Sequence, residues 1–339
     1  QGIDHMPTAV LDMDNSESSR ALIIAMQNSE TYDPYLVRSL DEISEEIGSG
    51  RAMAAWVIQP DFENQLNRSG VEPASLQLIV DGSDILTAQT AVEVGQGLVA
   101  TYGLEHSTAG ASGLRSMQIA ASGELPLDIS LRVWFNEEMK ESNYMIPSEL
   151  GFIAAAITAM IASMAIAKER EMGTLEQLMI TPIRSTELVI GKSVMAVSMG
   201  FTLFVLMFGM VVLWFGVPMR GSISLLFILA LIYMLVELGW GLMISSFAKS
   251  QMQALLIAFA VIMVMVIFSG YAFPVETMPP FMQIIANLFP LKHWLIMFRS
   301  IMLKGAGLDV VWPELLAILV LGIFIYAGTI LLLRRKKLE

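Results

Sequence analysis

The chain has 339 residues, of which 55% are hydrophobic, and its formal net charge is −12. The acidity excludes nucleic-acid binding, which needs a basic face, and the absence of cysteine excludes disulfides and thiolate metal sites. Residues 1–145 hold 22 acidic and 7 basic residues (net −15), whereas residues 146–339 hold 10 and 13 (net +3). The split indicates a soluble acidic domain joined to an apolar membrane domain.

Strand and helix patterns alternate through the first domain. Short apolar runs predict strands, and the pairs Asp14 with Glu17 and Ser39 with Glu42 have the spacing of helix caps. Four strand–helix units in succession predict a small α/β sheet domain, and no Gly-rich phosphate loop follows any strand. The predicted strands are 9–11, 35–37, 54–58, 76–80 and 128–135, and the predicted helices are 20–26, 39–47, 61–66 and 86–102.

The second domain, residues 146–339, contains five apolar runs. Each has roughly the 20 residues that a helix needs to cross about 30 Å of hydrocarbon. Basic residues flank the loop after the first run and end the chain at 334–337, and by the positive-inside rule these sites are cytoplasmic. Residues 1–145 would then be extracytoplasmic. The predicted spans are 148–167, 193–216, 222–246, 252–272 and 314–333.

Prolines divide residues 273–313 into apolar pieces of about ten residues, too short to span a membrane. Such pieces suit a re-entrant hairpin that dips in from the outer face and packs against protein. A structured external loop is the alternative, and the sequence leaves both open. The basic side chains of this segment would lie near the external headgroups. They are Lys292, His293, Arg299 and Lys304.

The segment 168–192 lies between the first two spans and is rich in charge. Apolar residues recur every three positions from Met172, which predicts a helix that Pro182 ends. Ser185 can cap a second helix that returns to the membrane. A broken amphipathic segment at a membrane surface suits docking to a soluble partner, although an ordinary cytoplasmic loop stays open on chemistry alone.

The residues of this segment resemble a known family. E-R-E-x-G-T-L-E-Q-L from Glu169, followed by Thr181-Pro182 and Gly191-Lys192, is similar to the cytoplasmic coupling segment of the ABC-2 family of ATP-binding-cassette export permeases, in particular its drug-efflux-like members. The resemblance extends over nearly the whole chain. It implies an α-helical polytopic membrane protein (ABC-2, type V exporter-like) with an extracytoplasmic α/β domain. The family pattern has six spans, so we expect an N-terminally truncated sequence that lacks the first.

The resemblance also implies a function. The chain would be the permease subunit of an ATP-driven exporter that moves amphipathic, drug-like molecules out across a bacterial inner membrane. It would be no enzyme and bind no cofactor itself, because a partner ATPase subunit would use ATP and Mg²⁺. A second permease subunit (identical or different), membrane lipids and a periplasmic adaptor protein would be its other partners. The residues assigned to ATPase contact are Glu169, Arg170, Glu171, Met172, Gly173, Thr174, Leu175 and Glu176.

Glu237 is the one acidic residue deep inside a predicted span. A carboxylate at that depth is costly and marks a candidate functional site. With Trp240 it would line the substrate path, and a structural hydrogen bond between helices is the alternative. No catalytic constellation is present in the sequence, because the three histidines are far apart and show no ligand spacing.

Two other functions fit the same pattern. One is export of a lipid or glycan by a permease of the same family, against which the large external domain counts mildly. The other is a membrane-anchored sensor or mechanotransmitter, in which the α/β domain binds an extracytoplasmic partner and nothing is transported. Drug accumulation in cells would separate the transport functions from the sensor.

Overall fold

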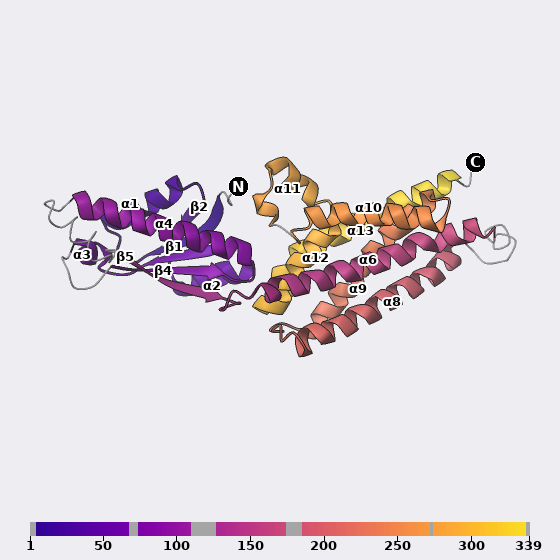
Figure 1. Cartoon of the computed structure of the whole chain (residues 1–339), viewed down its shortest axis with the longest axis horizontal. Helices are drawn as coiled ribbons and strands as arrows, with labels where there is room; N and C mark the ends of the chain where they lie inside the picture. Colours follow the sequence, from indigo (N-terminus) through magenta and orange to yellow (C-terminus); the bar gives the residue numbers. More distant parts are fainter. Residues whose placement is uncertain (1–4, 68–73, 110–126, 174–184, 272–273, 337–339) are drawn as a thin grey trace. The chain divides into compact units, whose positions relative to one another are not determined.

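The computed structural model describes residues 5–67, 74–109, 127–173, 185–271 and 274–336 (Figure 1). The chain forms two compact units, Gln1–Glu141 and Ser142–Glu339. The first is an α/β unit and the second is helical.

The α/β unit is a five-stranded sheet in the order β2-β1-β3-β4-β5 (Figure 1). Every neighbouring pair of strands is parallel except β3 and β4, which are antiparallel. Its core includes Trp56, whose ring meets Tyr32 edge-on at 5.9 Å. The elements are β1 (Met6–Asp12), α1 (Glu17–Asn28), β2 (Tyr32–Leu36), α2 (Leu40–Ser49), β3 (Ala54–Ile58), α3 (Phe62–Asn67), β4 (Ala74–Asp81), α4 (Ile85–Ala109) and β5 (Leu127–Trp134).

The α/β class expected from the sequence is confirmed, but the antiparallel pair was not anticipated. The physical reason is that an apolar run specifies that a strand forms but not its direction in the sheet. Strand direction depends on how the whole unit packs, and an antiparallel neighbour needs no crossover helix between the two strands.

Of the two helix caps predicted in the first unit, one is correct. Ser39 Oγ accepts a hydrogen bond of 3.1 Å from the Glu42 N–H at the start of α2. The Asp14 prediction is wrong, because Ser16 caps α1. Asp14 instead accepts a hydrogen bond from the Glu63 N–H at 3.1 Å, a tertiary contact that sequence spacing cannot show.

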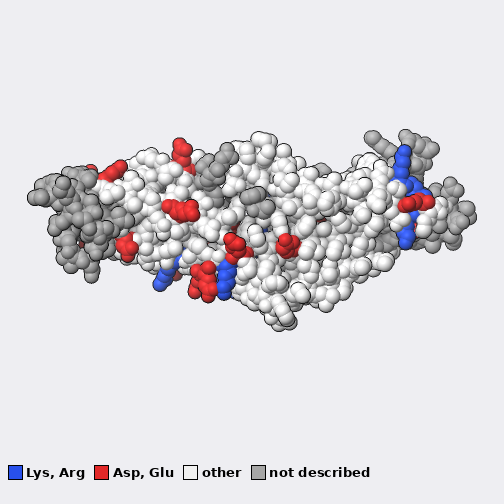
Figure 2. Space-filling view, viewed as in Figure 1, with Lys and Arg blue, Asp and Glu red and all other residues white. Residues whose placement is uncertain are grey.

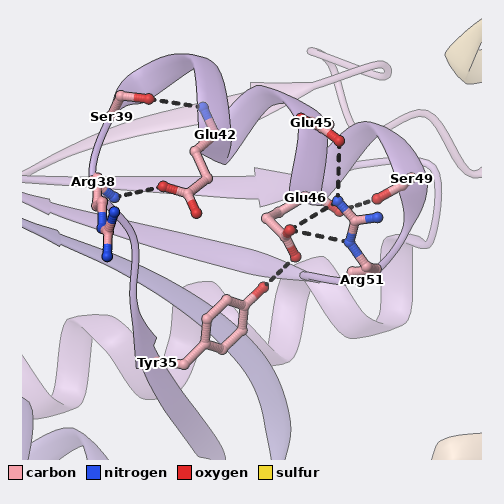
Figure 3. A network of polar contacts seen from close by, with 8 residues as sticks. All are labelled: Tyr35, Arg38, Ser39, Glu42, Glu45, Glu46, Ser49 and Arg51. Atoms are coloured by element: carbon pink, nitrogen blue, oxygen red, sulfur yellow. Dashed lines mark hydrogen bonds and ion pairs between the residues drawn. The ribbon is translucent and has the colours of Figure 1, made fainter.

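A polar network fixes the far end of α2 (Figure 3). The Arg51 guanidinium lies 2.8 Å from Glu46 Oε1. The other carboxylate oxygen, Glu46 Oε2, accepts a hydrogen bond of 2.9 Å from the Tyr35 hydroxyl. The hydrogen bond from the Arg51 guanidinium holds the pKa of Glu46 below its ordinary value. The charged pair therefore stabilises α2 at pH values above the usual carboxyl pKa, and this contribution is lost as the pH falls through the lowered pKa.

We expect Arg51→Met to remove this pH dependence. At neutral pH the loss of protection should be small, because solvent and salt screen an exposed ion pair. Hydrogen exchange of the α2 amides in the full-length protein, measured from pH 7 down to pH 3, would show it. Glu45→Gln is the matched control, since Glu45 is more exposed and lies 3.4 Å from the same guanidinium. Equal protection of wild type and Arg51→Met at pH 7 would contradict the expectation.

The described residues of the second unit contain five helices that are long and apolar enough to cross a membrane. This confirms the polytopic α-helical fold with five spans. Figure 2 shows a broad uncharged surface over these long helices, which ends in a group of charged side chains near the C-terminal end of α6. The helices are α6 (Glu141–Glu171), α8 (Ser185–Leu213), α9 (Ile223–Phe247), α10 (Gln251–Phe268) and α13 (Leu308–Lys336).

The helices α6 and α9 form the centre of this unit. Within the most apolar stretch of each helix, 56% of α6 and 50% of α9 is buried, against 28% of α8 and 22% each of α10 and α13. Helix α9 contacts α8, α10, α12 and α13. The apolar outer faces of α8, α10 and α13 are left for lipid or another protein.

Between α10 and α13 the chain makes two short helices that are bent by 85° to one another. Both begin with a proline, which suits the first turn of a helix because its missing N–H has no partner there in any case. The re-entrant placement of this pair stays a prediction. The elements are η1 (Val275–Thr277), α11 (Pro280–Ala286), α12 (Pro290–Arg299) and the π-helical turn η2 (Ser300–Lys304).

Two basic side chains of this region connect helices to one another. The sequence analysis predicted only that they lie near the lipid headgroups. The Arg299 guanidinium donates to Ser148 Oγ at 2.7 Å and to the Gly270 carbonyl at 3.2 Å, and it lies 3.8 Å from the centre of the Tyr144 ring. His293 is buried and pairs with Glu314 of α13. These contacts tie α12 to α6, to the end of α10 and to α13.

Candidate functional site

Four residues at four-residue spacing form one stripe along α9. Side chains at i and i+4 lie on the same face of a helix. We call this set the α9 stripe. Its members are Tyr233, Glu237, Gly241 and Ser245.

The C-terminal half of the α9 stripe lies against α6. Ser245 Oγ accepts hydrogen bonds from the N–H groups of Ile166 at 3.0 Å and Ala167 at 3.1 Å. A Cβ atom at Gly241 would lie 2.5 Å from the carbonyl oxygen of Ala159, so only glycine permits this approach. Since both sets of contacts advance in the same direction along the two helices, α6 and α9 run parallel.

The N-terminal end of the α9 stripe is an aromatic stack. The Tyr233 ring stacks on Trp294 of α12, with centroids 4.9 Å apart and planes 4° apart. Phe204 and Phe298 pack on the same indole ring at 6.1 and 5.4 Å. A Cβ atom at Gly151 of α6 would lie 2.7 Å from Trp294 Nε1. The stack therefore lies against α6 as well.

Glu237 lies between these two contacts and faces α6. It is 0% exposed, and among the described residues no side chain on another helix donates a hydrogen bond to its carboxylate. The Tyr233 hydroxyl, one turn earlier on α9, interacts with this carboxylate without forming a well-aligned hydrogen bond. Two indole N–H groups, Trp240 Nε1 and Trp294 Nε1, are buried and have no hydrogen-bond partner among the described residues. The interhelical hydrogen bond that a purely structural Glu237 requires is thus not made in the part of the chain that the structure describes.

The sequence of the spans supplies no counter-charge. The predicted spans 148–167, 193–216, 222–246, 252–272 and 314–333 contain no Lys, Arg or His. In the described ranges no three His, Asp or Glu side chains gather closely enough to hold a metal ion. A buried carboxyl group without a positively charged partner costs free energy, so its presence in α9 requires an explanation.

The C-terminal end of α6 is hydrogen-bonded to the turn between α9 and α10. The Arg170 guanidinium donates to the carbonyl oxygen of Ala248. Glu171 Oε2 accepts two hydrogen bonds from Gln251, from the backbone N–H at 2.8 Å and from the side-chain amide at 3.1 Å. We call these contacts the α6 brace. Two residues that were predicted to contact an ATPase are therefore also engaged within the chain.

Helix α6 ends at Glu171, and the helix predicted from Met172 toward Pro182 lies almost entirely outside the described residues. Gly173 has a φ of +67°, a conformation that only glycine adopts easily, and no atom lies within 4 Å of its added Cβ. The assignment of Gly173 to ATPase contact stays a prediction, and the backbone conformation is a second reason for a glycine at this position. Met172 is 54% exposed and is free for a partner. Glu169 lies in the last turn of α6, whereas Thr174, Leu175 and Glu176 lie outside the described residues.

The sequence analysis singled out Glu237 and Trp240 as candidates but not Tyr233 and Trp294, and the roles of all four stay predictions. The sequence could have indicated Tyr233, because it lies one helical turn from Glu237 and therefore on the same face of the helix. Trp294 could not be assigned, because its partner lies 61 residues away on another helix.

Comparison with known proteins gives a consistent result. The model of a family described as "ABC-2 family transporter protein" matches residues 1–332. "Probable multidrug ABC transporter permease YbhR" of Escherichia coli (strain K12) is 30% identical over 97% of this chain and 86% of its own length.

Two further relatives from the same organism are each 26% identical. "Probable multidrug ABC transporter permease YbhS" matches over 96% of this chain and 83% of its own length. "Inner membrane transport permease YhhJ" matches over 98% and 85%. The matched length and the five apolar spans agree: this chain is a multi-pass membrane protein that belongs to the ABC-2 family of transporter permeases.

Proposed function

We propose that the chain is the permease subunit of an ATP-driven exporter and moves amphipathic, drug-like molecules out of the cell. A separate ATPase subunit binds ATP and Mg²⁺ and drives it. The names of two relatives support the drug-like class, since each is called a "Probable multidrug ABC transporter permease". The inner membrane is the site of action, with the C-terminus in the cytoplasm and residues 1–145 outside.

The observation that carries this proposal is the α6 brace together with the α9 stripe. An ATPase that displaces the segment after Glu171 pulls on α6 and, through Gln251, on the turn that starts α10. Ser245 then passes the movement to α9. It lies 8 residues, or about 12 Å along the helix, from Glu237. One rigid route therefore joins the end of α6 to the buried carboxyl group.

The exposed apolar faces of the second unit support further partners for the exporter. Membrane lipids and a second permease subunit, identical or different, cover α8, α10 and α13. A periplasmic adaptor protein is the proposed partner of residues 1–145.

Two variants separate docking from transmission. Met172→Asp places a charge on an exposed apolar contact, so we expect association with the ATPase to weaken by about tenfold. Glu171→Ala removes both hydrogen bonds to Gln251, so we expect normal association but a loss of export per ATP hydrolysed of roughly fivefold or more. Co-purification with the ATPase, ATP hydrolysis and export from inverted vesicles measure the three quantities.

Gln251→Ala is the matched control for the brace, because it removes one of the same two hydrogen bonds from the other side and should uncouple less. If the ATPase binds wild type and Met172→Asp equally, the end of α6 is no docking element. Association without export of any small molecule would favour a sensor or mechanotransmitter. Export of only lipid or glycan would correct the substrate class.

A further inference from the structure

Buried polar atoms that lack a well-formed hydrogen bond lie along one face of α9 and on the helix packed against it. Among the described residues of the second unit they belong to Tyr233, Glu237, Trp240 and Trp294, and the carboxylate of Glu237 interacts only with the Tyr233 hydroxyl of its own helix. The first three share a face of α9, and Trp294 stacks on Tyr233. We propose that these four residues form a binding site for an amphipathic organic cation, such as a quaternary ammonium, a phosphonium or a protonated amine.

The chemistry of the cluster selects a cation. Glu237 supplies the one negative charge, and no basic side chain lies in the spans to neutralise it. Tyrosine and tryptophan rings attract cations through the negative potential of their faces, and this attraction grows when water is excluded. An anionic ligand would meet an unpaired carboxylate in an apolar interior, which is strongly unfavourable.

The surroundings also select an apolar body on the ligand. Phe204 and Phe298 pack around Trp294, and Gly151 lies at its edge. A small hydrated ion would lose its water here and gain few oxygen ligands. A bulky cation with aryl or alkyl groups keeps its charge beside Glu237 and buries its apolar part against these rings.

The site is enclosed in this structure, because Glu237, Tyr233 and Trp294 are all buried. A ligand therefore enters when α6 or α12 separates from the α9 stripe. In the proposed function the ATPase displaces α6, so the contact between α6 and α9 at Gly241 is the one that would open. This inference rests on the proposed function, since it names the substrate class of that exporter.

The test is binding of tetraphenylphosphonium to the full-length protein, purified without the ATPase and measured by equilibrium dialysis. We expect saturable binding that Glu237→Gln weakens by about tenfold or more. The neutral analogue triphenylphosphine oxide should bind wild type and variant alike. Glu149→Gln is the matched control, because Glu149 is a carboxylate of the same unit that contacts Tyr271 and not this cluster; it should leave the affinity within about twofold.

A second measurement needs no variant. A hydrophobic carbodiimide that modifies buried carboxyl groups should label Glu237, and tetraphenylphosphonium should block the labelling. Equal affinity of wild type and Glu237→Gln, absence of saturable binding to wild type, or labelling that the cation does not reduce would each overturn the inference. Because neither assay contains ATPase, a failure of ATPase docking would overturn the proposed exporter and leave these results unchanged.

Discussion

Replacing Glu237 with leucine is expected to make the protein more stable and inactive. Both carboxylate oxygens are buried, and among the described residues no side chain of another helix donates a hydrogen bond to them. A buried polar group that is not fully satisfied costs about 1–3 kcal/mol. An apolar side chain of similar size removes that cost. The midpoint of thermal unfolding of the purified protein should therefore rise, at about 2–4 °C per kcal/mol for a unit of this size, while cation binding and export are lost.

Glu149→Leu serves as the control, because we expect it to change the unfolding midpoint in the opposite direction. Glu149 accepts a hydrogen bond from the Tyr271 hydroxyl, so its replacement removes a made contact and should lower the unfolding midpoint. A fall in the midpoint for Glu237→Leu would mean that the carboxyl group stabilises the fold through a partner, and that the cluster is structural. A gain in stability with loss of transport is the behaviour expected of a site kept for function.

Much of the architecture could be predicted from the chain itself. Apolar runs of about 20 residues specify membrane helices because length and hydrophobicity alone decide insertion. The Ser39 cap was equally predictable, since donor and acceptor are three residues apart. These features depend on local sequence, and local sequence is what periodicity and spacing describe.

The candidate site was predictable only in part, because some of its residues are far apart in the sequence. Glu237 is conspicuous because a carboxylate inside a span is rare. Its aromatic neighbour Trp294 comes from a short helix whose position depends on the packing of the whole unit. Glu171 is a second example of a contact that the sequence could not show. The resemblance assigned it to an ATPase partner, but it also accepts two hydrogen bonds from Gln251, which lies 80 residues away.

The contact between α6 and α9 can be tested at Gly241. We expect Gly241→Val to destabilise the protein by about 3 kcal/mol, at the upper end for an overpacked core. A Cβ atom there would lie 2.4 Å from Ala162 Cβ and 2.5 Å from the backbone oxygen of Ala159, and backbone cannot move aside as a side chain can. Gly209→Val in α8 is the matched control, because no atom lies within 4 Å of its added Cβ.

The consequence for function follows from the position of Gly241 on the α9 stripe. It lies one turn from Ser245, which holds α6 by two hydrogen bonds, and one turn from Glu237. Forcing α6 away at this point should break the route between the α6 brace and the buried site, so that ATP hydrolysis continues while export stops. Unfolding midpoints and export per ATP would show both effects. If Gly241→Val and Gly209→Val behave alike, the close approach of α6 and α9 carries neither stability nor coupling, and the movement must reach Glu237 through α12 instead.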